Sequence, residues 1–81
     1  MDRPNAISLT ELSADNHATI LAFHTGTVET TRLASLGFTP GAEVSMSQNY
    51  GYGPLIVTVR GTHVALGRVE AAKIYVEQRV E

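Results

Sequence analysis

Apolar and polar residues alternate along two stretches of the chain, residues 43–48 and 55–60. Successive side chains of a strand point to opposite faces of a sheet, so this alternation predicts two strands that each turn one face to a core. The expected core positions of these strands are Val44, Met46, Leu55, Val57 and Val59. Arg60-Gly61 then predicts a tight hairpin turn into a further strand over residues 62–66.

Two other stretches predict strands at either end of this pattern. Residues 18–24, ATILAFH, carry apolar side chains on both faces and predict a first strand. A last strand is expected from Ile74 onward. Between the hairpin and this last strand, residues 67–73 predict a short helical turn, and we expect Val69 and Ala72 on its inner side.

A short helix is predicted before residue 37, where glycine follows LASL. Leu33 and Leu36 are three positions apart and share one helical face. Gly37 stands where a helix commonly ends with a residue of positive φ, and Phe38 can then contact Leu33. Leu33, Leu36 and Phe38 are therefore expected in the core.

The flanks of this helix carry further local signals. Thr27 is a candidate N-cap, and Glu29 lies in the first turn, where a negative charge is favoured. After the helix, residues 39–42 (TPGA) predict a type II turn, because proline presets φ at the second position and glycine supplies positive φ at the third. Leu9 and Leu12 have the spacing of a single helical turn, or of a short entry segment packed on the core.

These elements together predict a mainly β fold. Five short strands in 81 residues are expected to form a small barrel, which removes exposed sheet edges, with one short α-helix between the first two strands and a helical turn before the last. Residues 1–6 are expected to form a flexible N-terminal tail, and residues 7–81 a single domain.

Composition excludes several classes of protein. The formal net charge of −2 removes the electrostatic footprint of a general nucleic-acid binder. The absence of cysteine excludes disulfides, thiolate metal sites and a cysteine nucleophile. No stretch has the length of a signal peptide core or of a membrane span, so we expect a soluble, cytoplasmic domain without membrane insertion.

Three segments resemble one known family in their order and wording. They are RLASLGFTPGAEV at 32–44, GPLIVTVRG at 53–61 and ALGRVEAAKIYV at 65–76. Together they are similar to the ferrous iron transport protein A (FeoA) family, over roughly residues 7–78. The resemblance implies an SH3-like small barrel in the bacterial cytoplasm. It also implies a partner, the membrane GTPase permease ferrous iron transport protein B (FeoB), which takes up Fe(II).

The chain departs from the family pattern at two places. Family members often have two basic residues before the helix leucine, whereas here Thr31 precedes Arg32. A Pro-Gly turn is usual near the start, and here Asp15-Asn16 takes its place. The first departure weakens the expectation of a basic contact at that helix face.

Residues that could support catalysis are scattered. The acidic residues stand singly, and no serine or histidine lies in a nucleophile signature such as Gly-x-Ser-x-Gly. The glycines of residues 49–54 lack the lysine and hydroxyl residue of a phosphate-binding loop. We therefore expect no enzyme activity, no catalytic residue and no cofactor.

The three histidines are the obvious candidates for a metal site. His17 and His24 are seven residues apart, or roughly 23 Å along an extended strand, and ligands of one ion lie about 2 Å from it. His63 can meet His24 only if their strands are neighbours. We expect no dedicated metal site within one chain.

Binding to a partner protein is the better-supported role. Tyr50 and Tyr52 alternate with glycines in a short loop, and tyrosine and arginine are common at interface hot spots. Arg60 at the hairpin tip and Arg32 on the outer helix face are secondary candidates. One tyrosine ring could instead close the end of the barrel, and each arginine could be a solvated surface charge.

The leading hypothesis is a non-enzymatic accessory protein that binds the cytoplasmic part of FeoB and modulates its assembly or its GTP hydrolysis. One alternative is a divalent-metal-responsive switch that alters self-association. Another is a generic peptide-binding barrel with partners outside iron transport. A weak homo-oligomer is compatible with each of the three.

Overall fold

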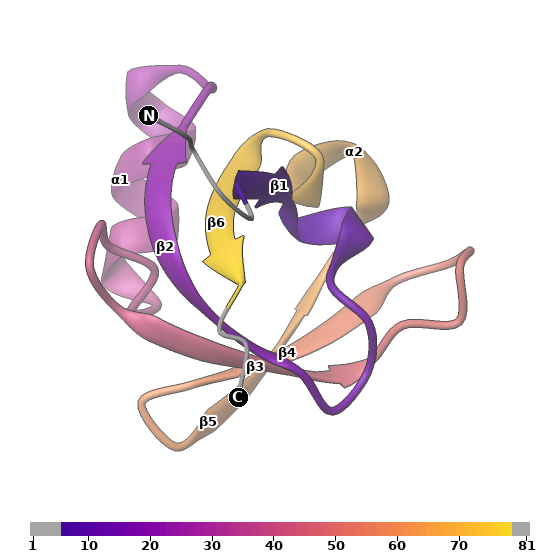
Figure 1. Ribbon diagram of the computed structural model, residues 1–81. Coiled ribbons are helices and arrows are strands. Elements are labelled where there is room, and N and C mark those ends of the chain that lie inside the picture. The colour runs from indigo at the N-terminus through magenta and orange to yellow at the C-terminus, as the bar shows by residue number, and fades with distance from the viewer. Residues whose placement is uncertain (1–5, 79–81) are drawn as a thin grey trace.

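Six antiparallel strands form one strongly curved sheet in the computed structural model, which describes residues 6–78 (Figure 1). The sheet order is β1-β6-β2-β3-β4-β5. The strands are β1 (Ala6–Ser8), β2 (His17–Phe23), β3 (Glu43–Gln48), β4 (Leu55–Val59), β5 (Thr62–Leu66) and β6 (Ile74–Gln78). The predicted mainly β class is confirmed, with one strand more than expected.

The additional strand is β1, which pairs with β6 through Ile7 and Val76. Three residues are too few to show an alternation, so the sequence pattern gives no sign of this strand. Residues 1–5 of the expected tail lie outside the described residues, and Ala6 begins β1. The two ends of the sheet, β1 and β5, do not pair with each other among the described residues, so hydrogen bonds do not close the expected barrel.

Three short helical elements complete the fold. They are the 3-10 helix η1 (Leu9–Glu11), the α-helix α1 (Thr27–Ser35) between β2 and β3, and α2 (Arg68–Ala71) before β6. η1 packs against α2 and β6, at the place where the chain enters the sheet (Figure 1). Leu9 and Leu12 are fully buried there, so both the expected helical turn and its packing on the core are present.

The core lies inside the curved sheet and consists of apolar side chains alone among the described residues. All five inner positions expected for β3 and β4 are buried, and so are Ile74 and Val76 of β6. Because successive side chains of a strand point alternately to the core and to solvent, only the side chains on one face of the sheet contribute to this core. The buried residues are Leu9, Leu12, Ala18, Ile20, Leu33, Phe38, Val44, Met46, Leu55, Val57, Val59, Leu66, Ala71, Ile74 and Val76.

For three residues, the prediction that the side chain is buried in the core is wrong. Leu36 is 38% exposed, because it is the C-cap of α1 and its side chain lies beyond the last turn that faces the core. Val69 is 75% exposed, and Ala72 is also exposed. α2 has only four residues after its N-cap Gly67, and it turns Ala71 to the core instead.

The end of α1 follows the sequence prediction. Gly37 has φ of +104°, and its N–H donates to the carbonyl of Ala34 over 3.0 Å. The N–H of Phe38 donates to the carbonyl of Leu33, also over 3.0 Å. This pair of bonds is the Schellman motif, and it satisfies carbonyls that the helix leaves open. Leu33 and Phe38 are both fully buried beside it.

The beginning of α1 differs from the prediction. Gly26, not Thr27, is the N-cap, and Thr27 is already the first helical residue. The hydroxyl of Thr25 instead donates a hydrogen bond to the Glu29 carboxylate. A hydrogen bond between two side chains, and not a side-chain cap at Thr27, therefore connects the first turn of the helix to the preceding loop.

The two predicted turns are present. The N–H of Ala42 donates to the carbonyl of Thr39 over 2.9 Å, and Gly41 has the positive φ (+91°) of a type II turn. Arg60 and Gly61 connect β4 to β5 with φ of +52° and +79°. Positive φ at both central residues is typical of a type I′ hairpin, whose twist matches that of the strands.

Candidate interaction surface

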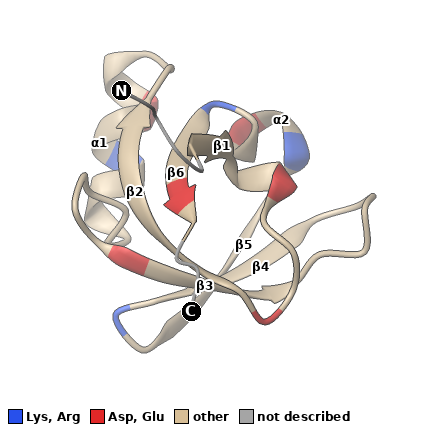
Figure 2. Ribbon diagram, in the orientation of Figure 1, with Lys and Arg blue, Asp and Glu red and all other residues tan. Residues whose placement is uncertain are grey.

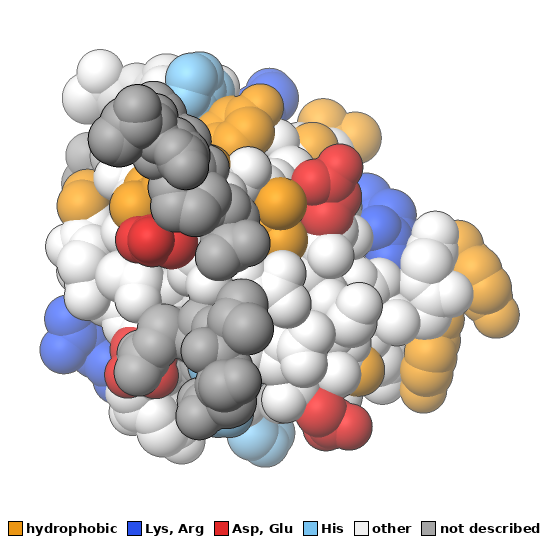
Figure 3. All heavy atoms as spheres, in the orientation of Figure 1, with side chains coloured by type: hydrophobic (Ala, Val, Ile, Leu, Met, Phe, Trp, Pro, Cys, Tyr) orange, Lys and Arg blue, Asp and Glu red, His pale blue; other side chains and the backbone are white. Residues whose placement is uncertain are grey.

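The loop between β3 and β4 presents two tyrosine rings to solvent. Tyr50 is 67% exposed and Tyr52 is 72% exposed, with ring centroids 6.3 Å apart and planes tilted by 44°. Neither ring folds back to close the barrel. Gly51 and Gly53 have positive φ, which lets the loop reverse direction between and after the tyrosines. Hydrophobic side chains project from the side of the molecule where this loop lies (Figure 3).

Asn49 fixes the base of this loop. Its Nδ2 donates to the carbonyls of Thr10 (3.1 Å) and Leu12 (2.9 Å), next to η1. Its Oδ1 accepts the N–H of Gly51 over 3.0 Å and a bond from the guanidinium of Arg68 at the start of α2. One amide side chain thereby connects the loop to two helical elements. These hydrogen bonds hold the loop that carries the tyrosines, so the loop should lose little conformational entropy when a partner binds.

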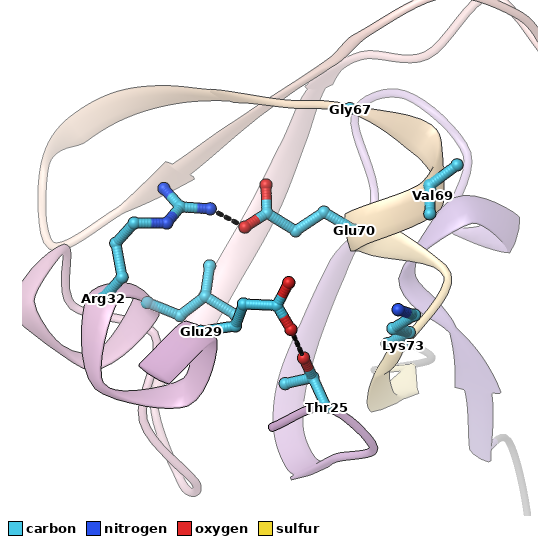
Figure 4. Close-up of a pocket in the computed structure, with 8 residues that line it drawn as sticks. Thr25, Glu29, Arg32, Gly67, Val69, Glu70 and Lys73 are labelled. Carbon is cyan, nitrogen blue, oxygen red and sulfur yellow. Dashed lines mark hydrogen bonds and ion pairs between the residues drawn. The ribbon is translucent and has the colours of Figure 1, made fainter. Parts of the chain in front are cut away.

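A second candidate surface is the cleft between α1 and α2 (Figure 4). Its volume is about 350 Å³, and one of the residues that line it, Leu33, is fully buried. Arg32 of α1 forms an ion pair with Glu70 of α2 across it. The side chain of Arg32 is half-exposed, so this pair is solvated on one side. The cleft is lined by Thr25, Glu29, Arg32, Leu33, Gly67, Val69, Glu70 and Lys73.

Glu29 and Lys73 carry opposite charges into the same cleft. The hydrogen bond from Thr25 is the main reason that the pKa of Glu29 is lowered below its ordinary value. Partial desolvation of the carboxylate raises this pKa and is the second-largest contribution, while the positive charge of Lys73, the N–H of Gly26 and the charge of Arg32 each lower the pKa by smaller amounts. The carboxylate therefore stays ionised beside the N-terminus of α1, where the helix dipole favours it.

Arg60 does not extend freely from the hairpin tip. Its side chain lies over Gly37, so that a Cβ at position 37 would sit 3.3 Å from Arg60 Cδ and 3.5 Å from Nε. This places a guanidinium at the C-terminal end of α1, where the helix dipole favours positive charge. Arg60 therefore connects the β4–β5 hairpin to α1 and still presents its charge at the surface.

The structure does not bring the four predicted contact residues together. The loop with Tyr50 and Tyr52 lies on one side of the molecule, and α1 with Arg32 lies on the other (Figure 1). Arg60 lies near the end of α1, not near the tyrosines. Lysine, arginine and acidic residues are spread over the ribbon without a large patch of one sign (Figure 2).

Sequence reasoning missed the residues that complete the cleft. Glu70 and Lys73 stand singly in the sequence, far from Arg32, and no local pattern links them. Val69 was expected in the core and instead lies at the cleft, largely exposed. Only the tertiary fold, which places α1 and α2 on the two sides of this cleft, brings these residues together.

The histidines lie on separate parts of the sheet. His24 follows β2 and contacts the Tyr75 ring edge to face, at 4.6 Å between centroids. His63 lies on β5, and its Nδ1 is 2.8 Å from the Thr58 hydroxyl. β5 pairs with β4 and not with β2, so His63 and His24 are not on neighbouring strands. Within residues 6–78, no group of three or more metal-ligating side chains of the His, Cys, Asp and Glu types is present.

No helix of the described chain is long and apolar enough to cross a membrane.

A family model for the FeoA domain matches residues 7–78 of this chain. The chain belongs to the FeoA family. The match covers the whole described sheet except Ala6, so the family resemblance of the three sequence segments is confirmed. A comparison with the curated proteins found no match.

Solved FeoA structures share this architecture. The crystal structure of an iron uptake regulatory protein (FeoA) matches with a TM-score of 0.86 and 26% identity, over 91% of this chain and 99% of that one. The zinc complex of Stenotrophomonas maltophilia FeoA matches with a TM-score of 0.77 and 33% identity, over 88% of this chain and 89% of that one. That protein is described as a prokaryotic SH3 domain protein, and the predicted SH3-like fold is thus confirmed.

The same fold also occurs within larger proteins. A manganese-dependent transcriptional repressor matches 98% of this chain with a TM-score of 0.85, but the match covers only 45% of the repressor and the identity is 18%. That similarity concerns the fold alone. Membership of the FeoA family places the chain in ferrous iron transport.

Proposed function

We propose that this chain is a non-enzymatic accessory protein of ferrous iron uptake that binds the cytoplasmic part of FeoB and modulates its assembly or activity. The observation that carries the proposal is the exposed pair Tyr50 and Tyr52 on a loop braced by Asn49. Tyrosine contributes a large contact area with few rotatable bonds, and it is enriched at interface hot spots.

Arg32 and Arg60 have a smaller part in this proposal. Each already has an intramolecular contact, Arg32 with Glu70 and Arg60 with the end of α1. An exposed ion pair contributes little energy, so a partner can take over such a guanidinium at low cost. The arginines therefore tune orientation and association rate more than affinity.

The test is a calorimetric titration of the purified chain with the cytoplasmic part of its permease, with and without GTP. We expect binding, and we expect Tyr50→Ala and Tyr52→Ala each to weaken it about tenfold, which corresponds to about 1.4 kcal/mol. Tyr75→Ala is the matched control, because Tyr75 is a tyrosine on β6, away from the loop. Absence of binding in both nucleotide states would overturn the proposal. We also expect the chain alone to hydrolyse no GTP.

A metal-responsive switch is the second candidate function. The FeoA of Stenotrophomonas maltophilia, at 33% identity, was solved with zinc. In this chain the exposed His63 has its Nδ1 engaged by Thr58, which leaves Nε2 to accept a metal shared with a second copy. Calorimetry with Fe(II), Mn(II) and Zn(II), combined with sedimentation, separates this function from the first. Tight binding with a change in sedimentation supports the switch, and loss of both in His63→Ala assigns it to this residue.

A further inference from the structure

A guanidinium lies at the base of the tyrosine loop, which comprises residues 49–54. Arg68 begins α2, and its Nη2 donates to Asn49 Oδ1, the same oxygen that accepts the N–H of Gly51. The guanidinium and the loop backbone are therefore neighbours, and α2 lies on the same side of the molecule as the loop (Figure 1). Among residues 6–78, no acidic side chain forms an ion pair with Arg68.

Most of the donor capacity of this guanidinium is unused. Arginine has five N–H donors, and within the described chain the only hydrogen bond of the Arg68 side chain is the one to Asn49. Nε is buried and has no hydrogen-bond partner there. Buried polar atoms almost always have a partner, so an unpaired donor on a charged group indicates a ligand. The Arg68 side chain is partly exposed, so a partner can reach it.

The neighbouring carboxylates do not neutralise this charge. Glu70, on the same helix, forms its ion pair with Arg32 across the cleft. Glu11 belongs to η1, which packs against α2, but it forms no ion pair within the described chain. Residues 44–69 contain no acidic residue, so the tyrosine loop, β4 and β5 supply no counter-charge. The base of the loop therefore attracts an acidic group of a partner.

The tyrosines and the single cation together define what fits here. Tyr50 and Tyr52 are largely exposed, and their ring centroids are 6.3 Å apart, so they form one apolar surface beside the charge. Phosphate groups are usually recognised by clusters of arginines, whereas the tyrosine loop has Arg68 alone at its base. A planar guanidinium matches one carboxylate, and the charge-assisted hydrogen bonds between them are strong.

We propose that Arg68 is a specificity-determining residue that binds a side-chain carboxylate of the protein partner, next to an apolar side chain that packs on Tyr50 and Tyr52. Asn49 already holds the guanidinium in place, so binding loses little side-chain entropy. This inference deepens the proposed function and rests on it, because it names the chemistry of the permease segment that the tyrosine loop recognises.

NMR titration of the full chain with two short peptides tests the chemistry of this site. The first peptide is Gly-Leu-Asp-Leu-Gly with both ends blocked, and the second has asparagine in place of aspartate. We expect the aspartate peptide to shift the Nε–H signal of Arg68 and the amide signals of residues 49–54, and to bind about tenfold more tightly than the asparagine peptide. Equal affinities would overturn the inference. Inorganic phosphate that shifted these signals as strongly would reveal a general anion site, and would overturn it too.

Arg68→Gln separates recognition of the carboxylate from support of the loop. Glutamine retains an N–H₂ group that can donate to Asn49 but carries no charge. We expect this variant to bind the two peptides equally, whereas Lys73→Gln, the matched control for the loss of one positive charge, should retain the preference for aspartate. If Arg68 only supports the loop, Arg68→Gln will weaken both peptides and leave the preference unchanged, which would overturn the inference. The titrations of the unaltered chain remain decisive even if Arg68→Gln does not fold.

The permease fragment then separates this inference from the proposed function. Arg68→Gln should weaken binding of the fragment about tenfold, and Lys73→Gln by less than about twofold. If the fragment does not bind the unaltered chain, the proposed function fails, and the peptide titrations still decide whether Arg68 binds a carboxylate. If the fragment binds and Arg68→Gln does not weaken it, this inference fails alone.

Discussion

Arg60 covers the one glycine on which the end of α1 depends. A Cβ at position 37 would lie 3.3 Å from Arg60 Cδ and 3.4 Å from Val59 Cγ2, and Gly37 itself has φ of +104°. The close approach and the backbone conformation both disfavour a side chain at this position. The helix end, the hairpin tip and the core below Val59 are therefore one packed unit.

Gly37→Ala should destabilise the protein by about 2–3 kcal/mol, because it adds a contact with Arg60 to the strain of positive φ. Gly41→Ala is the matched control. Gly41 has φ of +91°, but no described atom lies within 4 Å of its Cβ position, so only the strain of about 1–2 kcal/mol is expected. Urea unfolding of both variants measures the difference. Equal losses would show that Arg60 moves aside without cost.

The features that the sequence predicts well are those that a few neighbouring residues determine. Gly37 and Phe38 define the helix end, residues 39–42 define the turn, and Arg60-Gly61 defines the hairpin. In each case the conformation follows from the φ that glycine allows or proline imposes. The alternation of β3 and β4 is predicted for a similar reason, because side chains one position apart always face opposite ways.

The remaining features depend on pairings between distant residues. Arg32 and Glu70 meet only because the fold places α1 and α2 on the two sides of one cleft. The four-residue α2 is too short for a helical period, so its inner residue, Ala71, could not be distinguished from Ala72. The exposure of Tyr50 and Tyr52 likewise follows from Asn49, whose partners lie at residues 10, 12 and 68.

Asn49→Asp should destabilise the protein by about 2 kcal/mol. A carboxylate cannot donate, so the carbonyls of Thr10 and Leu12 lose their partner. The bond from Arg68 can persist, which limits the loss. Tyr52→Ala is the control in the same loop, and because Tyr52 is largely exposed its effect should stay within about 0.5 kcal/mol. Urea unfolding measures both, and an unchanged midpoint for Asn49→Asp would contradict the bracing role.

The Arg32–Glu70 ion pair should contribute little to stability. Both side chains are partly exposed, so a double-mutant cycle with Arg32→Ala and Glu70→Ala should give a coupling energy of about 0.2–1 kcal/mol. The coupling should shrink as salt is added, because screening acts on exposed charges. A coupling that is large and independent of salt would show that the cleft excludes water from the pair.

The Thr25–Glu29 hydrogen bond should make the stability of the folded protein depend on pH in the acidic range. Because this bond lowers the pKa of Glu29, the ionised carboxylate stabilises the folded state above the ordinary pKa of 4.5. That stabilisation is lost as the pH falls through the lowered value. Thr25→Val removes the hydroxyl, so the pKa of Glu29 should rise toward its ordinary value, which NMR titration of its side-chain carbons measures.

Unfolding experiments complete this test by comparing neutral pH with an acidic pH below the Glu29 titration midpoint that NMR gives, where Glu29 is protonated. The unaltered chain should be more stable than Thr25→Val at neutral pH, and the difference should narrow in acid, because a protonated carboxyl accepts the Thr25 bond less strongly. In the Glu29→Gln background, Thr25→Val should have the same effect at both pH values. A pH-dependent effect that persists there would assign the dependence to another carboxylate.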